Sequence, residues 1–195
     1  MKNICVYGSS SAALDKIYFD AATSLGALLA QAGYGLVFGA GNMGLMGAAA
    51  RGVHSKGGYV TGVIPEFMNV DDIPYKKCDE LIVTQTMRER KQIMEEKSDG
   101  FIAAPGGIGT FEEFFEILTL KQLKQHKKPV VLLNTNNYYN NIQDMMELCV
   151  SEQFAKEQTL ELYTMVDTPE QAVEYISNYK HKDFALKWFT ATSKE

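Results

Sequence analysis

Short, uninterrupted apolar runs alternate with helix-like segments along the chain, and this alternation limits the folds that the chain can adopt. The apolar runs predict strands at residues 2–8, 34–39, 58–65, 80–84, 100–107, 128–134 and 162–167. Helical patterns separate them, at residues 13–32, 86–97, 110–124, 138–157 and 169–179, and one more helix opens in the glycine-rich stretch 39–47 and ends near residue 56. Strands that are apolar on both faces, separated by helices, predict a mainly parallel sheet covered by helices on both sides.

This order of elements is typical of a single doubly wound, Rossmann-like α/β domain. We expect that domain to span residues 1–179 and to be followed by a C-terminal tail over residues 180–195. Ligands of such folds bind beyond the carboxyl ends of the strands. Three turns follow predicted strands, namely Gly8-Ser9-Ser10, residues 39–47 and residues 105–110. We therefore expect these three turns to line one shared edge of the sheet.

The composition narrows the classes of partner. The chain has 195 residues, of which 46% are hydrophobic, and its formal net charge is −5. This acidic balance disfavours a broad nucleic-acid-binding face, although it allows a small basic pocket for one phosphate. No run approaches the ~18 apolar residues that a membrane-spanning helix needs, and the first apolar run is too short for a signal peptide. We expect a cytoplasmic protein that binds neither nucleic acid nor membrane.

The cysteines and histidines are dispersed along the chain. Cys5, Cys78 and Cys149 form no C-x-x-C pair, which argues against a disulfide framework and against a zinc site. The three histidines show no metal-binding spacing either. His54 and His126 fall near predicted helix ends, where we expect them at the surface.

The first glycine turn, "FGAGNMGLMG" at residues 38–47, matches a dinucleotide fingerprint. Gly39, Gly41 and Gly44 fit G-x-G-x-x-G, which would indicate an NAD(P)-dependent oxidoreductase. However, the turn follows the second predicted strand rather than the first. The acid that could hold the ribose, Glu66, also lies beyond Pro65. The alternative is a tight strand-to-helix turn that lets the helix pack closely on the sheet.

The second glycine turn, "APGGIGTFEEFF" at residues 104–115, is the more specific pattern. The backbone N–H groups of residues 107–110 would point out of a helix start, where the helix dipole favours an anion. No lysine follows as in an ATP-binding P-loop, so the turn is typical of a site for a monophosphate. Thr110 is the expected N-cap. Glu113 then either completes a capping box with Thr110 or acts in catalysis, and Glu112 is an ordinary first-turn acid unless a ligand uses it.

The helix "TMRERKQIMEEK" at residues 86–97 contains an arginine on its apolar face. The helix opens with a second capping-box pattern, formed by Thr86 and Glu89. Arg90 projects into the arc formed by Met87, Ile93 and Met94. A buried arginine needs an anionic partner. The partner could be a glutamate in an ordinary buried ion pair, a catalytic carboxylate or a substrate phosphate.

Two of these motifs together resemble those of a known family. "PGGIGTFEE" fits the pattern PGGxGTxxE, and "MRERK" fits M-x-x-R-K, with the spacing found in the LONELY GUY (LOG) family. "GLMGAAARG" is similar to the first glycine turn of that family, and the resemblance covers about residues 2–178. LOG proteins are cytokinin riboside 5′-monophosphate phosphoribohydrolases, often mislabelled as lysine decarboxylases. The resemblance implies a hydrolase that cleaves a nucleoside 5′-monophosphate into free base and ribose 5-phosphate.

The resemblance also implies which residues form the site. Its catalytic arginine and glutamate fall on Arg90 and Glu113. Its substrate-binding positions, with glycines from the two turns, fall on Gly41, Lys91, Gly106, Gly107, Ile108, Gly109, Thr110, Phe111, Glu112 and Thr119. It implies a homodimer with active sites near the interface, a small-molecule nucleoside monophosphate as partner, and neither cofactor nor metal. Ala40, where relatives often carry glycine, and Ile108, where many plant members carry tyrosine, leave the preferred base open.

A mechanism fits these residues. Glycosidic cleavage passes through an oxocarbenium-like state, which a nearby negative charge stabilises. Glu113 could supply that charge, hold the ribose hydroxyls and activate water, while the permanently cationic Arg90 orients Glu113 and the substrate. The turn at 106–110, with Lys91, would hold the 5′-phosphate. A nucleotide-binding protein without catalysis and an NAD(P)-dependent oxidoreductase are the alternatives, and nothing marks a cofactor-bearing lysine for a decarboxylase.

Overall fold

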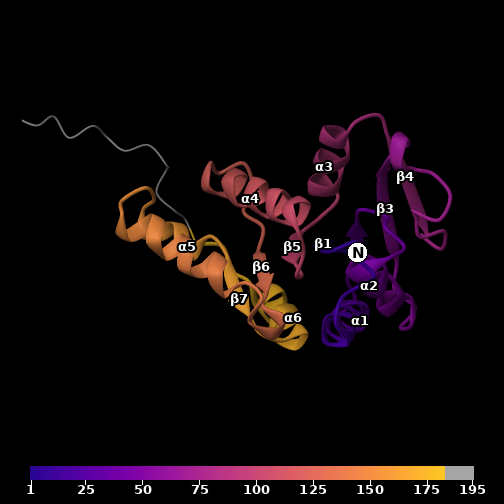
Figure 1. The fold of residues 1–195 in the computed structure, drawn as a ribbon, viewed down its shortest axis with the longest axis horizontal. Coiled ribbons are helices and arrows are strands. Elements are labelled where there is room, and N and C mark those ends of the chain that lie inside the picture. Colours follow the sequence, from indigo (N-terminus) through magenta and orange to yellow (C-terminus); the bar gives the residue numbers. More distant parts are fainter. Residues whose placement is uncertain (183–195) are drawn as a thin grey trace, which may run out of the picture.

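A seven-stranded sheet in the order β4-β3-β2-β1-β5-β6-β7 forms the centre of the molecule (Figure 1). The computed structural model describes residues 1–182. The strands are β1 (Asn3–Tyr7), β2 (Gly35–Phe38), β3 (Val60–Pro65), β4 (Glu80–Thr84), β5 (Gly100–Ala103), β6 (Val130–Leu133) and β7 (Thr164–Val166). Every neighbouring pair is parallel. The predicted doubly wound α/β fold is therefore confirmed, and its sheet is parallel throughout.

Within residues 1–182, six α-helices cover the sheet. They are α1 (Lys16–Gln31), α2 (Gly44–His54), α3 (Met87–Glu96), α4 (Ile108–Gln122), α5 (Asn140–Ser151) and α6 (Pro169–Asn178). Figure 1 shows α3 and α4 above the sheet and α1, α2 and α6 below it. One apolar cluster joins α1, α2 and α6 to one face of the sheet, and a second joins α3, α4 and α5 to the other. None of the helices within residues 1–182 has the length and apolar character needed to cross a membrane.

The edge strand β4 departs from the expected two-sided cover. Leu81 and Val83 alternate with more buried residues and are exposed on one face of this strand. Gly62 lies opposite Leu81 in the neighbouring strand β3 and adds no side chain to that face. The helices below the sheet pack over its central strands and leave this edge uncovered.

Helix caps decide where α3 and α4 begin. Thr86 caps α3, because its hydroxyl accepts a hydrogen bond from the Glu89 N–H at 3.1 Å, while the Glu89 carboxylate accepts from Gln85 rather than from Thr86. The expected cap of α4 is wrong. Gly107 is the N-cap, the helix begins at Ile108, and Thr110 lies within its first turn. The capping box with Glu113 does not form, because the Glu113 carboxylate accepts a hydrogen bond from Arg90 instead.

The expected surface position of His126 is also wrong. His126 is buried between α4 and β6, where its Nε2 lies 2.9 Å from the Ile117 carbonyl oxygen and its Nδ1 accepts from the Lys128 N–H at 3.2 Å. His54 is half-buried and contacts the Tyr75 hydroxyl and Asp79. Both imidazoles satisfy hydrogen bonds within the fold. Most of the expected C-terminal tail, residues 183–195, lies outside the described residues.

Candidate functional site

The turns that follow β1, β2 and β5 meet at one edge of the sheet, as predicted. The Ser9 N–H donates to the Pro105 carbonyl at 3.0 Å, and the Leu45 N–H donates to the Ser9 carbonyl at 2.8 Å. Strands β1 and β5 are neighbours in the centre of the sheet, and the order of the strands reverses between them. This is the switch point at which doubly wound folds bind ligands.

A cavity of about 360 Å³ opens at this switch point. It is lined by Ser9, Ala13, Leu14, Asp15, Tyr18, Pro105, Gly106, Gly107 and Tyr138. The second glycine turn therefore borders the cavity. Asn42 of the first glycine turn lines another cavity of about 290 Å³ together with Arg51 and Tyr75. The N–H of Leu45, in the same turn, donates to the carbonyl of Ser9, which borders the switch-point cavity, so the two glycine turns lie next to each other at this edge.

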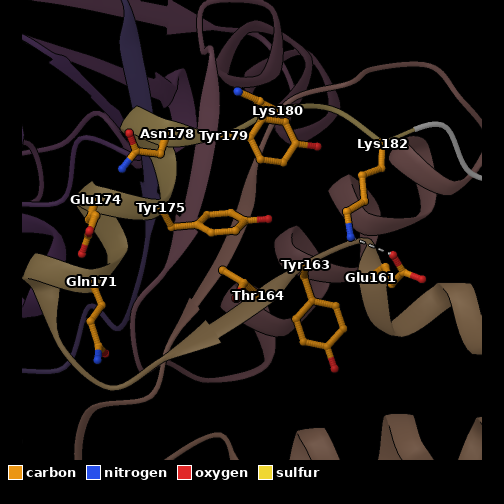
Figure 2. Close-up of a pocket in the computed structure, with 10 residues that line it drawn as sticks. All are labelled: Glu161, Tyr163, Thr164, Gln171, Glu174, Tyr175, Asn178, Tyr179, Lys180 and Lys182. Carbon is orange, nitrogen blue, oxygen red and sulfur yellow. Dashed lines mark hydrogen bonds and ion pairs between the residues drawn. The ribbon is translucent and has the colours of Figure 1, made fainter.

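A larger cavity of about 500 Å³ lies away from these turns, between β7 and α6 (Figure 2). Tyr163, Tyr175 and Tyr179 line it, and Lys182 forms an ion pair with Glu161 at 3.3 Å at its border. None of the site residues expected from the sequence lines this cavity.

Arg90 of α3 and Glu113 of α4 form a buried ion pair. The Arg90 Nη1 donates to the Glu113 Oε1 at 3.1 Å, and the Arg90 Nε donates to the Val63 carbonyl at 3.1 Å. Their side chains are only 8% and 12% exposed. Burial raises the pKa of the Glu113 carboxyl, and the charge and hydrogen bond of Arg90 partly oppose that rise. The pair thus holds a carboxylate in a fixed position close to the start of α4.

Glycines of the first turn make room for other parts of the protein. A Cβ on Gly39 would overlap the Arg90 Nη2, so the missing side chain gives the guanidinium its place. A Cβ on Gly44, which has a φ of +63°, would overlap the Ser9 carbonyl. Gly41 forms an isolated bridge with Pro74. These contacts favour the tight-packing interpretation of the turn over the dinucleotide fingerprint.

Lys91 is engaged by acidic side chains of α4. Its Nζ forms an ion pair with Glu112 and another with Glu116, the second at 3.1 Å. Burial disfavours the charged form of Lys91, but the two carboxylates outweigh it and raise the pKa of its ammonium. Lys91 therefore ties α3 to α4, and it is not among the residues that line the cavity at the switch point.

The site residues expected on helix α4 lie on two of its faces. Thr110 and Glu113 are directed into the protein, and Phe111 packs against Tyr139. Ile108, Glu112 and Thr119 are spaced along the opposite, exposed face, which also carries Phe115. Ile108 is 86% exposed. Gly109 is exposed in the first turn.

The comparisons with known proteins agree with the two sequence motifs. The family model described as "Possible lysine decarboxylase" matches residues 46–176. The cytokinin riboside 5′-monophosphate phosphoribohydrolase LOG2 of Arabidopsis thaliana is 36% identical over 188 residues, which cover 95% of this chain and 88% of that protein. The rice enzyme of the same name, LOG of Oryza sativa subsp. japonica, is 38% identical over 92% of this chain and 76% of its own length. The chain belongs to the LOG family.

Solved structures with this LOG fold include proteins that are named for another ligand. The molybdenum cofactor binding protein of Rippkaea orientalis has a TM-score of 0.70 at 26% identity, and the match covers 90% of this chain and 95% of that chain. The molybdenum cofactor carrier protein of Chlamydomonas reinhardtii has a TM-score of 0.69, also at 26% identity, over 90% and 96%. The fold of the LOG family therefore also occurs in proteins that are named as carriers.

The structure of this LOG-family chain adds residues that the sequence analysis missed. Tyr138 and Tyr139 follow β6, and their hydroxyls donate to the carbonyls of Gly106 and Ala104. The signal was available in the sequence, because "NNYYNN" follows a predicted strand and so falls at the same edge. Among residues 1–182, no group of three His, Cys, Asp or Glu side chains is placed to hold a metal ion.

Proposed function

We propose that this chain hydrolyses the N-glycosidic bond of a nucleoside 5′-monophosphate. The observation that carries the proposal is the buried pair of Arg90 and Glu113 beside the glycine-rich start of α4. The names of the relatives at 36–38% identity support the same activity. N6-modified adenosine 5′-monophosphates are the substrates that those names suggest, as in cytokinin activation.

The proposed reaction uses water and two side chains. The bond between C1′ and the base nitrogen breaks while a water oxygen bonds to C1′, and the proton lost by water balances the one gained by the base. Positive charge develops on the ribose in such reactions, and the Glu113 carboxylate would stabilise it. Arg90 would hold that carboxylate in place. The 5′-phosphate would bind at the start of α4, where the first N–H groups have no acceptor within the helix.

Product formation tests this proposal. The protein is incubated with AMP and with N6-isopentenyl-AMP, and free base and ribose 5-phosphate are measured. We expect both products from at least one substrate and a loss of turnover of about 10²-fold or more in Glu113→Gln. Glu96→Gln, on the exposed side of α3, is the control and should keep wild-type turnover. Failure to release base from either nucleotide would count against the proposal.

A carrier without catalysis is the second candidate. It is favoured by the structural neighbours that are named as molybdenum cofactor binding and carrier proteins. A carrier would bind its ligand and return it unchanged. Binding of AMP without any product would therefore select this candidate, whereas saturable binding of NAD(P)H would be needed to revive the oxidoreductase.

We also propose that two copies of the chain associate through the exposed face of α4. Ile108 and Phe115 are apolar and solvent-exposed there, next to Glu112 and Thr119. The family resemblance gives ligand contacts to Ile108, Glu112 and Thr119, although they face away from Glu113 in one chain. In a dimer that packs through this face, these residues would lie at the candidate site.

A further inference from the structure

The turn between β5 and α4 has three consecutive carbonyl groups, and each one accepts a hydrogen bond from elsewhere in the protein. The Tyr139 hydroxyl donates to Ala104 at 2.8 Å. The Ser9 N–H donates to Pro105 at 3.0 Å, and the Tyr138 hydroxyl donates to Gly106 at 2.6 Å. The donors come from the segments that follow β1 and β6. The orientation of this turn is therefore set by two neighbouring strand ends rather than by the turn itself.

Fixing a carbonyl also fixes the N–H that follows it. The peptide unit is planar and trans, so its C=O and the next N–H point in opposite directions. The Ser9 contact thus fixes the direction of the Gly106 N–H, and the Tyr138 contact fixes that of the Gly107 N–H. Each contact also occupies a negatively polarised oxygen that would otherwise repel an anion at this turn.

The direction of these N–H groups matters because the described part of the chain places no cationic side chain at the cavity. No lysine or arginine lines the switch-point cavity within residues 1–182, and Asp15 adds a carboxylate at its border. Lys91 is held by Glu112 and Glu116. A phosphate at this site would be attracted mainly by backbone N–H groups and by the dipole of α4.

We infer that Tyr138 is a positioning residue for the phosphate group: its hydroxyl holds the Gly106 peptide so that the turn recognises one phosphate monoester through neutral N–H donors. This inference rests on the proposed function, because it assigns the 5′-phosphate of the substrate to this turn. The Asp15 carboxylate at the border repels each added phosphate charge, which favours a single phosphate over a diphosphate. Tyr138 would therefore act on the affinity for the phosphate and not on the chemistry at C1′.

Tyr138 and Tyr139 differ in burial, and this difference decides which of them can be substituted to test positioning. Tyr138 is exposed, so water can reach the Gly106 carbonyl when the hydroxyl is removed. Tyr139 is buried, so removing its hydroxyl leaves the Ala104 carbonyl without a partner and destabilises the fold. Tyr138→Phe is therefore the variant that tests positioning with the smaller effect on folding.

The control is a more buried tyrosine whose hydroxyl also donates one hydrogen bond, in this case to a side-chain oxygen. The Tyr163 hydroxyl donates to the Gln143 Oε1 at 2.7 Å, and the residue lines the cavity between β7 and α6 (Figure 2). Tyr163→Phe removes one hydroxyl and one hydrogen bond, as Tyr138→Phe does, but it leaves the β5–α4 turn untouched. A general effect of losing a tyrosine hydroxyl would appear in both variants.

The experiment compares the full-length wild type, Tyr138→Phe and Tyr163→Phe by calorimetric titration with AMP, adenosine and inorganic phosphate. We expect Tyr138→Phe to bind AMP and phosphate about tenfold more weakly, with its affinity for adenosine unchanged. In turnover assays its KM for AMP should rise by the same factor while kcat stays close to wild type. Tyr163→Phe should match the wild type throughout.

The outcomes separate this inference from the proposed function. Equal AMP binding by Tyr138→Phe and wild type would overturn the inference while leaving the hydrolase intact. Equal losses for AMP and adenosine would also overturn it, because they would indicate a general disturbance. Release of base by a wild type that does not bind inorganic phosphate would place the phosphate elsewhere. Absence of both binding and product in the wild type would instead reject the proposed function.

A second measurement covers the case in which Tyr138→Phe folds poorly. Amide resonances of Gly106 and Gly107 in the wild type are followed by nuclear magnetic resonance while inorganic phosphate is added. Phosphate bound by these N–H groups should shift both resonances more than those of Gly57 and Gly58, which lie in the α2–β3 turn. Unchanged Gly106 and Gly107 resonances at saturating phosphate would overturn the inference.

Discussion

Arg90 owes its position to the absence of a side chain at Gly39. The guanidinium occupies the space that a Cβ on Gly39 would need, and the Val63 carbonyl holds its Nε from β3. Glu113 then accepts from its Nη1. Gly39 lies in the first glycine turn and Glu113 lies in α4, so a glycine outside α4 controls where the carboxylate of the candidate site is held.

Gly39→Ala should displace Arg90 and lower turnover by about 10²-fold, because a misplaced catalytic group costs on that order. Gly100→Ala, in the buried strand β5, is the control for adding a methyl group to the core. The decisive test is a double-mutant cycle with Arg90→Lys, since lysine lacks the Nη2 that the new methyl group would meet. Gly39→Ala should cost little in the Arg90→Lys background, and full additivity of the two losses would contradict the contact.

The raised pKa of Glu113 predicts how activity depends on pH. The proposed reaction needs the carboxylate, and burial favours the neutral acid. Because the pKa of Glu113 is raised in the folded protein, activity should be lost as the pH falls through that pKa, which is higher than the pKa of an ordinary glutamate. The acid limb of kcat/KM against pH measures this value. A limb at or below the ordinary glutamate pKa of about 4.3 would contradict the assignment.

At the residue scale, helical periodicity predicted that Arg90 needs an anionic partner, and the family resemblance rather than the periodicity pointed to Glu113. Helical periodicity placed Arg90 on an apolar face, and a buried guanidinium requires an anion. Which anion it meets depends on how α3 and α4 pack, and that depends on contacts between distant residues. Thr110 and Glu113 have the spacing of a capping box. In the structure, however, the Glu113 carboxylate accepts a hydrogen bond from Arg90 instead.

At the scale of elements, α4 joins two roles in one helix. Its start borders the switch-point cavity, and its outward face carries exposed apolar residues. Its far end packs against His126, which fixes the connection to β6. Each imidazole nitrogen of His126 has one contact, and the pattern fits the neutral ring with a proton on Nε2.

This buried histidine should make stability fall in mild acid. Burial lowers the pKa of His126 because the charged ring loses its hydration there, and together with the charges of Lys128 and Lys121 it brings that pKa down to about 4. The unfolded chain takes up that proton near pH 6.5, so the free energy of unfolding falls as the pH drops from about 6.5 to about 4.

The contribution of His126 to this fall amounts to roughly 3 kcal/mol over that window, from the difference between the two pKa values. Urea unfolding of wild type and His126→Gln at several pH values measures this contribution, because glutamine can keep both hydrogen bonds without titrating. The wild type should lose more stability than the variant below pH 6.5. Parallel curves for the two proteins would show that His126 does not titrate in this range.

The elements themselves were largely predictable from local patterns. The run "ELIVT" became β4 with the predicted bounds, and all seven predicted strands formed. The burial of His126 was not predictable in this way, because it depends on where the α4–β6 connection lies over the sheet. The tyrosines after β6 were missed for a similar reason, since their carbonyl partners lie more than 30 residues away.

For the whole molecule, the exposed apolar face of α4 predicts an effect of oligomeric state on activity. Phe115→Lys places a charge in the proposed interface, where it would be buried against the second copy. We expect this variant to elute as a monomer in size-exclusion chromatography with light scattering, and its turnover to fall with dimer content. Phe154→Lys is the control, since Phe154 is 83% exposed and lies beyond α5. A dimeric, fully active Phe115→Lys would reject this interface.

The fold as a whole was the most predictable level, and the arrangement of its cavities was the least. Alternating strands and helices with short turns admit few topologies. The shapes of cavities depend instead on particular side chains such as Tyr18 and Tyr138, whose rings meet edge to face beside the second glycine turn. The sequence could place the two glycine turns at one edge, but not show which of their residues line a cavity.

The central position of β1 has a consequence for the order in which the strands can assemble while the chain is being synthesised. The Asn3 N–H in β1 donates a hydrogen bond to the carboxylate of Asp99, just before β5, and the two residues are 96 positions apart in the sequence. At about 5 to 20 residues per second, the first strand waits roughly 5 to 20 s for that neighbour to be synthesised. Strands β2, β3 and β4 can add to β1 meanwhile, so the half of the sheet that holds Gly39 can assemble before Glu113 exists.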